Sequence, residues 1–200
     1  MSQQITTTIE LQLEKRNRTT ALFRIFLVIP VAIYSSSFFD YQNFSNNQRT
    51  GAFAGLFVFP VVLTLLVRGV YPSYVYTFNK AMMNLSLRIC SYILILNDQY
   101  PSIESNEKTF VELPEIDGGK SLSRGLPLVK WLLAIPLYIV GAIYIFYSLL
   151  LTLVAWLTVV FTGQYPEWCA AGVVGTIGYW NRVFGYAFAL VTDEYPSFSL

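Results

Sequence analysis

Four ionisable residues recur at matched positions in two largely apolar stretches of the chain. Arg88 and Arg182 lie in predicted helices, and Asp98 and Asp193 follow those helices and precede a Tyr-Pro pair. This pattern predicts a paired site for a lipid headgroup or a protein partner at a membrane interface, or else Arg–Asp ties within one repeat or across two. The tie is favoured, because ionisable groups near the interface are usually paired or extend toward water.

The other side chains offer little reactive chemistry. The chain has no His and only two Cys, Cys90 and Cys169, which excludes His-based metal sites, the usual general base near neutral pH and a disulfide framework. Residues 35–37 are three serines without a His partner, so a nucleophilic triad is not expected. We therefore predict no catalytic residue, no cofactor and no metal, and a protein that is not an enzyme.

The composition is that of an integral membrane protein. Of the 200 residues, 54% are hydrophobic and 12% are charged, whereas soluble domains carry roughly 25% charged residues. Thirteen Lys and Arg against twelve Asp and Glu give a net charge of +1, which provides no bulk attraction for nucleic acid. The elements that position the four ionisable residues are therefore expected to be membrane helices.

Three apolar runs define these expected membrane helices, since about 20 residues are needed to cross a hydrocarbon core of roughly 30 Å. The runs are Ala21 to Phe39, Gly51 to Val67 and Leu126 to Phe161. The third run has 36 residues, and as one straight helix it would extend about 54 Å. We therefore predict that it forms a hairpin of two short helices with a tight turn within 141–148. A re-entrant wedge is the alternative.

An internal repeat supports the hairpin. Four blocks recur in the same order: residues 23–30 with 129–136, 64–72 with 158–166, 88–92 with 182–186, and 98–103 with 193–198. The offset between the copies changes from 106 to 94 residues after the first block. The first copy thus contains 12 extra residues, the length of its polar loop 40–51. The second copy is expected to be the same unit without that loop.

A further helix is expected in each unit after the Tyr-Pro pair, because proline ends one helix and is tolerated in the first turn of the next. The helix after Pro72 carries a polar stripe at three- and four-residue spacings, formed by Thr77, Lys80, Asn84, Arg88 and Ser91. We expect it to lie in the membrane interface. The helix 168–191 is more apolar and is expected to pack against protein through small residues: Gly172, Gly175, Gly178 and Gly185.

The basic residues predict the orientation in the membrane. Twelve of the thirteen lie in segments assigned to one side, and only Arg49 falls in the expected outer loop. This asymmetry requires an even number of spans and predicts a cytoplasmic N-terminus, central linker and C-terminus. Near the cytoplasmic ends of spans, the expected interface anchors are Arg24, Arg68, Lys130, Tyr71, Tyr100, Tyr165 and Tyr195.

The predicted fold class is an all-α integral membrane protein, a tandem repeat of helical hairpin plus amphipathic helix with four transmembrane and two interfacial helices. The expected divisions are a cytoplasmic segment 1–19, a first unit 20–101, an acidic cytoplasmic linker 102–125 and a second unit 126–200. Alternating apolar residues from Ile5 to Leu13 predict a short strand, and Thr109 to Leu113 is a candidate partner strand.

Four blocks between residues 122 and 198 carry a family resemblance: Leu122 to Pro136, Phe161 to Pro166, Tyr179 to Val183 and Thr192 to Phe198. They resemble a bacterial inner-membrane family known as domain of unknown function 4389. The chain departs from that pattern at Leu137, where the family often has His, at Gln164, where Arg is common, and at Ser197, where Pro is common. The resemblance implies a bacterial inner-membrane location and brings no catalytic residues.

Three functional hypotheses follow from these observations. The first is a non-enzymatic accessory or scaffold subunit that packs against a larger inner-membrane complex, because close-packing surface is abundant and reactive groups are scarce. The second is lipid handling or membrane shaping, since short hairpins and amphipathic helices wedge into one leaflet. A small transporter or channel is the weakest, because no carboxylate falls in the middle of an expected span. Membrane lipids and a larger complex or a homo-oligomer are the expected partners, and nucleic acid is not.

Overall fold

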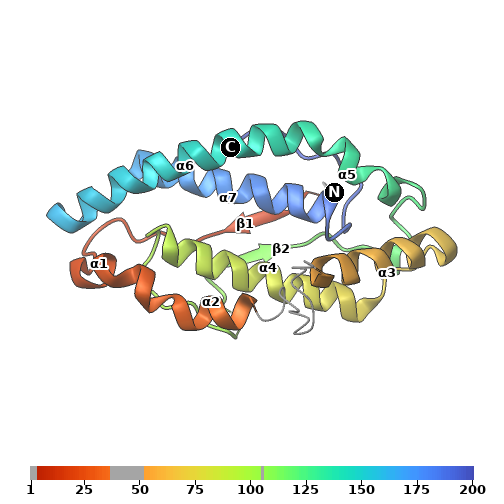
Figure 1. The fold of residues 1–200 in the computed structure, drawn as a ribbon, viewed down its shortest axis with the longest axis horizontal. Coiled ribbons are helices and arrows are strands. Elements are labelled where there is room, and N and C mark those ends of the chain that lie inside the picture. Colours follow the sequence, from red (N-terminus) through yellow and green to blue (C-terminus); the bar gives the residue numbers. More distant parts are fainter. Residues whose placement is uncertain (1–3, 37–51, 105) are drawn as a thin grey trace, which may run out of the picture.

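The computed structural model describes residues 4–36, 52–104 and 106–200, with the backbone alone at 36 and 52–57. The chain is mostly helical (Figure 1). Its helices are α1 (Arg18–Leu27), α2 (Ile29–Ser36), α3 (Ala52–Arg68), α4 (Ser73–Ile93), α5 (Lys130–Leu133), α6 (Ile135–Thr162) and α7 (Glu167–Ala187). The other described elements are the 3-10 turns η1 (Asp117–Gly119) and η2 (Leu126–Leu128) and the strands β1 (Thr6–Thr8) and β2 (Phe110–Glu112).

The two strands form an antiparallel ribbon in which Thr7 lies opposite Val111. A strand near the N-terminus and its partner in the linker are therefore confirmed over shorter bounds than predicted, Thr6–Thr8 and Phe110–Glu112, as is their pairing. β1 leads into α1, and β2 leads through the two 3-10 turns into α5. The first half (residues 4–101) and the second half (residues 106–200) therefore have the same order of elements. Each contains a strand, then an interrupted stretch of helix, then a final helix.

Each half has a helix break directly before an Ile-Pro pair. α1 ends two residues before Ile29, and α5 ends two residues before Ile135. Proline lacks the N–H that would bond to the carbonyl four residues earlier, and its ring crowds that carbonyl. Pro30 and Pro136 therefore end the preceding helix at matched positions.

Both halves also end their long apolar helices in the same way. α3 and α6 are followed by Gly69 and Gly163, whose φ angles are +62° and +76°, a left-handed conformation that glycine adopts without steric cost. Their N–H groups donate to the carbonyls of Leu65 and Val159 at 2.9 Å in each case. The Tyr-Pro pair then precedes α4 and α7, which have 21 residues each.

The predicted hairpin in the second half is wrong. α6 runs for 28 residues from Ile135 to Thr162, straight through the expected turn at 141–148. That segment has no proline and one glycine, so its backbone hydrogen bonding continues. Gly141 serves packing instead, because a Cβ there would lie 2.6 Å from Trp180 of α7. Without the polar loop, the counterparts of α2 and α3 are fused into one helix about 42 Å long. A re-entrant wedge also needs a turn and is equally excluded.

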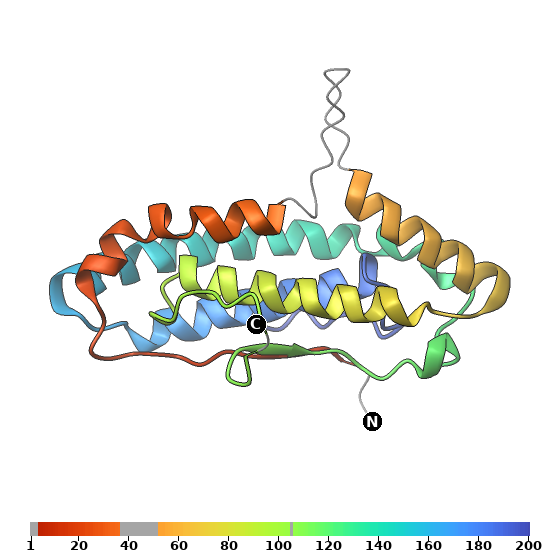
Figure 2. The ribbon, with the colours of Figure 1, turned by 90° about the horizontal axis from the view of Figure 1, so that it is seen from below.

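The helices form two layers, with the ribbon outside one of them (Figure 2). α1, α2, α3 and α6 form the outer layer, and α4 and α7 lie between it and the ribbon. α4 is a core helix of the molecule, and its expected position in the membrane interface stays a prediction. Its apolar side, including Met82 and Ile89, packs against Val31 of α2. Its polar side faces the ribbon, where Asn84 Oδ1 accepts from the N–H of Val111 at 2.8 Å.

Two described helical stretches, residues 18–35 and 135–162, are long and apolar enough to cross a membrane. This criterion rests on length and composition, and the four expected transmembrane helices are not confirmed. The expected outer loop 40–51, with Arg49, lies outside the described residues, as do the ends of the two neighbouring apolar runs.

The four expected packing glycines all lie on α7. Two of them, Gly172 and Gly178, have very different surroundings. A Cβ at Gly172 would overlap Leu151 of α6, so this glycine lets the two helices approach closely. At Gly178 a Cβ would have one near neighbour, Arg182 Nη1, at 3.6 Å. Gly172 therefore serves α6–α7 packing as predicted, and Gly178 does not.

The other two glycines make room for segments that are not helices. A Cβ at Gly175 would lie 2.9 Å from Leu200, near the C-terminus. A Cβ at Gly185 would overlap Ile5, which directly precedes β1. These glycines are used for packing inside the chain rather than for helix packing.

The contrast within α7 yields a test of the α6–α7 contact. We expect Gly172→Ala to lower the stability by about 1–3 kcal/mol, because the added methyl group overpacks the contact with Leu151. Gly178→Ala, on the same helix, should leave stability unchanged or raise it by up to about 1 kcal/mol through its better helix propensity. Thermal unfolding of both variants in the same mild detergent measures the difference, and equal losses would contradict the described packing.

Candidate functional site

Arg24 and Asp98 form the central polar contact of the first half. Arg24 is 2% exposed, and its Nη2 lies 2.5 Å from Asp98 Oδ1. Its Nη1 donates to the carbonyls of Tyr92 and Asn97 at 2.8 and 2.9 Å, and its guanidinium lies 4.4 Å from the centre of the Tyr92 ring. Arg16 contributes a second cation, 3.1 Å from the same Oδ1. The contact ties the end of α4 to α1.

Lys130 and Asp193 form the equivalent contact in the second half. Lys130 Nζ lies 2.6 Å from Asp193 Oδ1 and donates to the carbonyl of Thr192 at 2.6 Å. The ammonium also lies 5.2 Å from the centre of the Tyr186 ring. Burial raises the pKa of Asp193, but the hydrogen bonds from Lys130 and Ser123 outweigh this effect, so the pKa lies below its ordinary value. The carboxylate is therefore ionised at neutral pH.

The predicted partners of the two aspartates are wrong. The sequence predicts that Arg88 and Arg182 pair with these aspartates, within one repeat or across the two. In the described part of the chain, each aspartate pairs instead with the basic residue that stands six positions before the helix-breaking proline. A repeat shows which positions are equivalent, but it does not show which blocks touch.

Arg88 and Arg182 hold the segment that follows each aspartate. Arg88 Nε donates to the carbonyl of Ser102 at 2.8 Å, and Arg182 Nη2 donates to the carbonyl of Ser199. Both arginines thus tie the returning chain through backbone carbonyls. The expectation of a structural tie describes this geometry better than an open headgroup site.

Two of the three expected cationic anchors do not reach the surface. Arg24 and Lys130 have side chains that are 2% and 0% exposed, because each is enclosed by its aspartate, backbone carbonyls and an aromatic ring. Their role as exposed anchors is therefore wrong. Arg68 is exposed at the end of α3, where it remains a predicted anchor.

Tyr71 and Tyr165 are buried and link the two halves, so their predicted role as interface anchors is wrong. The hydroxyl of Tyr71 donates to the carbonyl of Ala189 at 2.6 Å, and that of Tyr165 donates to the carbonyl of Leu94 at 3.4 Å. Burial raises the pKa of Tyr71 to about 12 and also raises the pKa of Tyr165, so both hydroxyls are neutral donors. Each half therefore supplies one donor and one acceptor to the other.

Tyr100 and Tyr195 differ from the buried pair. Their side chains are partly exposed, and each meets a more buried tyrosine edge-on. The ring centres of Tyr100 and Tyr92 are 5.8 Å apart, and those of Tyr195 and Tyr186 are 5.6 Å apart. Interface anchoring stays a prediction for these two residues.

A second reciprocal contact joins the halves at the two ends of the molecule. Arg18 Nη2 donates to the carbonyl of Thr162 at 3.2 Å, at the end of α6. The guanidinium of Arg124 lies beside Gly69 at the end of α3, where a Cβ would be 2.9 Å from its Nε. A cation at a helix C-terminus is favourable because the last carbonyls carry partial negative charge. Each half therefore places an arginine at the apolar helix of the other.

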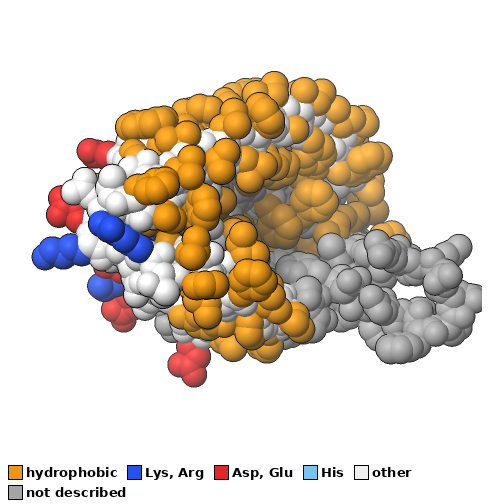
Figure 3. All heavy atoms as spheres, turned by 60° about the vertical axis from the view of Figure 1, so that its left-hand side comes forward, with side chains coloured by type: hydrophobic (Ala, Val, Ile, Leu, Met, Phe, Trp, Pro, Cys, Tyr) orange, Lys and Arg blue, Asp and Glu red, His pale blue; other side chains and the backbone are white. Residues whose placement is uncertain are grey.

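The outer layer exposes a broad apolar face (Figure 3). Its large exposed side chains include Phe23, Phe26 and Ile33 of α1 and α2, Phe59 and Val67 of α3, and Ile139, Ile143, Phe146, Leu150 and Phe161 of α6. In Figure 3 hydrophobic side chains cover most of the described surface, while charged side chains gather at the left edge. Soluble monomers rarely expose apolar patches beyond a few hundred Å². The apolar face therefore indicates contact with lipid or with another protein.

Reactive groups are sparse in the described residues. They contain no group of three or more His, Cys, Asp or Glu placed to hold a metal ion. Cys169 is buried and Cys90 is exposed, and neither forms a disulfide. No known protein family, curated protein or solved structure matches the chain. The resemblance to domain of unknown function 4389 stays a prediction.

The ion pairs were missed although their members were visible in the sequence. Arg24 and Lys130 stand at one matched position of the repeat, and Asp98 and Asp193 stand at another. Each half has one basic residue inside a long apolar run and one aspartate in the returning segment. This pattern indicates mutual pairing. Arg24 and Lys130 were instead expected to extend to the membrane interface, so their pairing with the aspartates was not predicted.

The pairs generate a stability prediction. We expect Asp193→Asn to lower the free energy of unfolding by about 3–5 kcal/mol, because it leaves the buried ammonium of Lys130 without an opposite charge. The matched control is Asp117→Asn, whose carboxylate is 80% exposed and 3.8 Å from Lys120. An exposed pair of this kind contributes at most about 1 kcal/mol. Unfolding in mild detergent measures both variants.

A double variant separates the ion pair from other effects of the substitution. Lys130→Met combined with Asp193→Asn should be more stable than the sum of the two single losses by about 0.5–3 kcal/mol, since no buried charge is left over. Additive losses would contradict the assignment of Lys130 and Asp193 as partners.

Proposed function

We propose that this protein is a non-enzymatic membrane protein whose apolar face is embedded in lipid, and that it acts by shaping the membrane or handling its lipids. The observation that carries the proposal is the separation of surfaces in Figure 3, with apolar side chains on the outer layer and charges at the opposite edge. Lipid can cover the apolar face continuously, whereas the ribbon and its charges stay in water.

The position of the ribbon favours an orientation with α6 along the membrane plane. The ribbon lies beneath the middle of the helical layers in Figure 2. Beside it lie Glu10 and Lys108, whose side chains are 42% and 67% exposed, and exposed Glu112. If α6 crossed the bilayer along its length of about 42 Å, these charges would stand at hydrocarbon depth. Each would cost about 2.5–3.5 kcal/mol there.

The basic residues support the same orientation. Arg18 lies at the C-terminal end of α6 through its bond to Thr162, and Arg124 precedes η2 and α5 at the other end. Positive residues concentrate on the cytoplasmic side of membrane proteins. Both ends of α6 are thus expected on that side, in the bacterial inner membrane that the family resemblance implies, with cytoplasmic termini.

The other two functional hypotheses have less support. An accessory subunit was inferred partly from the glycine-lined helix, but Gly172 and Gly185 of α7 face α6 and Ile5 within the same chain. A partner would therefore have to use the apolar face itself. A transporter or channel would need charged or polar carriers, and no Asp, Glu, Lys or Arg falls within Ile135–Thr162.

The orientation can be tested by labelling two positions at opposite ends of the molecule. In a Cys90→Ala/Cys169→Ala background, we expect Glu14→Cys and Lys120→Cys to react with a membrane-impermeant maleimide from the same side of oriented proteoliposomes. Glu14 lies beside the end of α6, because Leu13 accepts from the N–H of Tyr165, and Lys120 lies near the end of α3. Labelling from opposite sides would show that α6 crosses the bilayer. Full labelling of both in detergent is the control for reactivity.

Membrane shaping can be tested with variants of the apolar face. We expect the protein to convert large unilamellar vesicles into smaller vesicles or tubules at high protein density, as scored by electron microscopy. The triple substitution of Ile139, Ile143 and Phe146 by Lys should abolish this effect, because each buried lysine costs about 2.5–3.5 kcal/mol in the bilayer.

The matched control changes the same number of positions on the ribbon side. Substitution of Glu104, Glu107 and Glu112 by Lys should leave vesicle remodelling intact, since these exposed residues stay in water. Unchanged vesicles with the natural protein at high density, or co-purification of the chain in a fixed ratio with another membrane protein, would favour the accessory-subunit hypothesis instead.

A further inference from the structure

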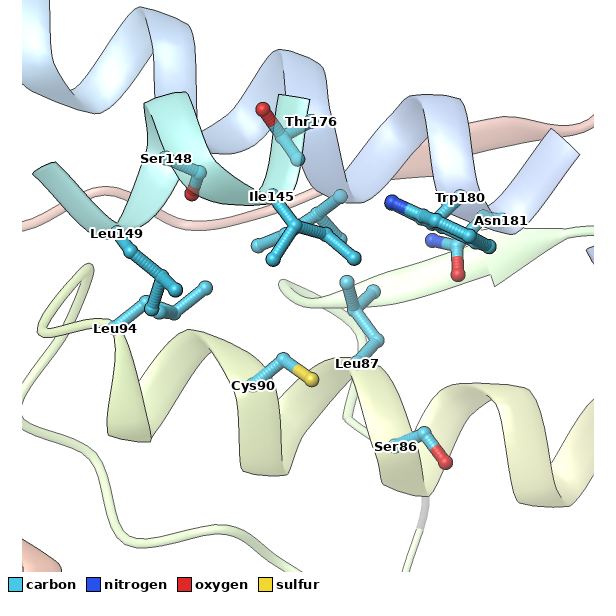
Figure 4. Close-up of a pocket in the computed structure, with 11 residues that line it drawn as sticks. Ser86, Leu87, Cys90, Leu94, Ile145, Ser148, Leu149, Thr176, Trp180 and Asn181 are labelled. Carbon is cyan, nitrogen blue, oxygen red and sulfur yellow. The ribbon is translucent and has the colours of Figure 1, made fainter. Parts of the chain in front are cut away.

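A cavity of about 230 Å³ lies between the two halves (Figure 4). One wall comes from α4, which contributes Cys90, and from Leu94 directly after it. The other walls come from α6 and α7 and include Ile145, Leu149 and Trp180. None of the eleven described residues that line it carries a charge. Empty apolar cavities of about 150 Å³ already accept a molecule the size of benzene, so this one has room for a stretch of hydrocarbon chain.

Three of the polar side chains in the walls are engaged within the protein. Thr176 Oγ1 donates to the carbonyl of Gly172 at 2.9 Å, and Trp180 Nε1 donates to the carbonyl of Gly141 at 3.3 Å. Asn181 Nδ2 donates to Thr7 Oγ1 at 2.9 Å. A polar ligand would therefore find few free donors, whereas an apolar ligand would meet mostly carbon.

The cavity opens toward the apolar face. Ile145 and Leu149 both line it, and both are also among the large exposed side chains of α6, at 44% and 56% exposure. An apolar chain can therefore move from the face into the cavity without passing through water. An acyl chain that enters from the bilayer is already out of water, so the hydrophobic effect gives it little reason to move. The driving force is the dispersion attraction between the chain and the side chains that line the cavity.

We propose that this cavity holds one acyl chain of a membrane phospholipid, whose headgroup remains outside. The inference rests on the proposed function, because the chain reaches the cavity through a face that is embedded in lipid. It adds a defined site to that function: the halves hold an individual lipid between α4 and α7 rather than contacting lipid only as a solvent.

The test uses two tryptophans as local reporters in lipid nanodiscs that contain phospholipid brominated on its acyl chains. A variant that retains only Trp180 reports on the cavity, and a variant that retains only Trp131, which is 60% exposed, reports on the surrounding bilayer. We expect the brominated chains to quench both tryptophans. Cys90→Phe, which fills the cavity from α4, should remove most of the quenching of Trp180 and leave that of Trp131 unchanged.

The matched control is Thr77→Phe, which adds a similar volume at an exposed position of α4 that does not line the cavity. It should leave both signals unchanged. Ser86→Phe fills the cavity from a second position and replaces Cys90→Phe if that variant does not fold, as judged by thermal unfolding.

The possible outcomes separate this inference from the proposed function. Quenching of Trp131 without quenching of Trp180, or quenching of Trp180 that survives both filling variants, would overturn the lipid site and leave the membrane orientation standing. Absence of quenching at both tryptophans would overturn the two proposals together. Quenching of Trp180 by dibromostearic acid but not by brominated phospholipid would assign the cavity to a free fatty acid and overturn the phospholipid site.

Discussion

The fold depends on a buried cation and an aspartate that meet in each half of the chain. The Arg24–Asp98 and Lys130–Asp193 distances are 2.5 and 2.6 Å, and both cations are enclosed by carbonyls and a tyrosine ring. Removing charges from water is costly unless each is paired and hydrogen-bonded. The apolar helices can therefore pack only in the arrangement that brings each aspartate to its cation, and this fixes where the chain after α4 and α7 must return.

The repeat could be found from the sequence because the residues that define it have strong local effects on where helices begin and end. Pro30 and Pro136 break a helix, Gly69 and Gly163 end one, and the Tyr-Pro pairs begin the next. The short strands were equally visible as alternating apolar residues. The ion pairs were not found, because equivalence between Arg24 and Lys130 says nothing about which distant residue either one contacts. The cavity was also beyond reach, since its walls come from three helices in two halves.

The hairpin error has a different cause. Residues 141–148 contain no proline, and no residue there forces the backbone out of a helix. The predicted turn rested on length, because a helix of 36 residues is too long to cross a bilayer perpendicular to it. Length is decisive only for a helix that crosses, and a long apolar helix need not cross. α6 packs one side against α7 and is apolar on its other sides. A helix of this kind has the same composition as one that crosses the bilayer, and both have the same sequence periodicity.

The exchange of hydroxyl bonds between Tyr71 and Ala189 and between Tyr165 and Leu94 has a consequence for the origin of the chain. Each half carries both the donor and the acceptor of this exchange, together with one strand of the ribbon and one arginine for the opposite helix end. Two identical copies of such a half could satisfy one another about a true twofold axis, as an isologous dimer does. Joining them covalently makes association independent of concentration. It also frees the copies to diverge, and the fused helix of one half, opposite the interrupted helix of the other, is the kind of asymmetry that a homodimer could never acquire.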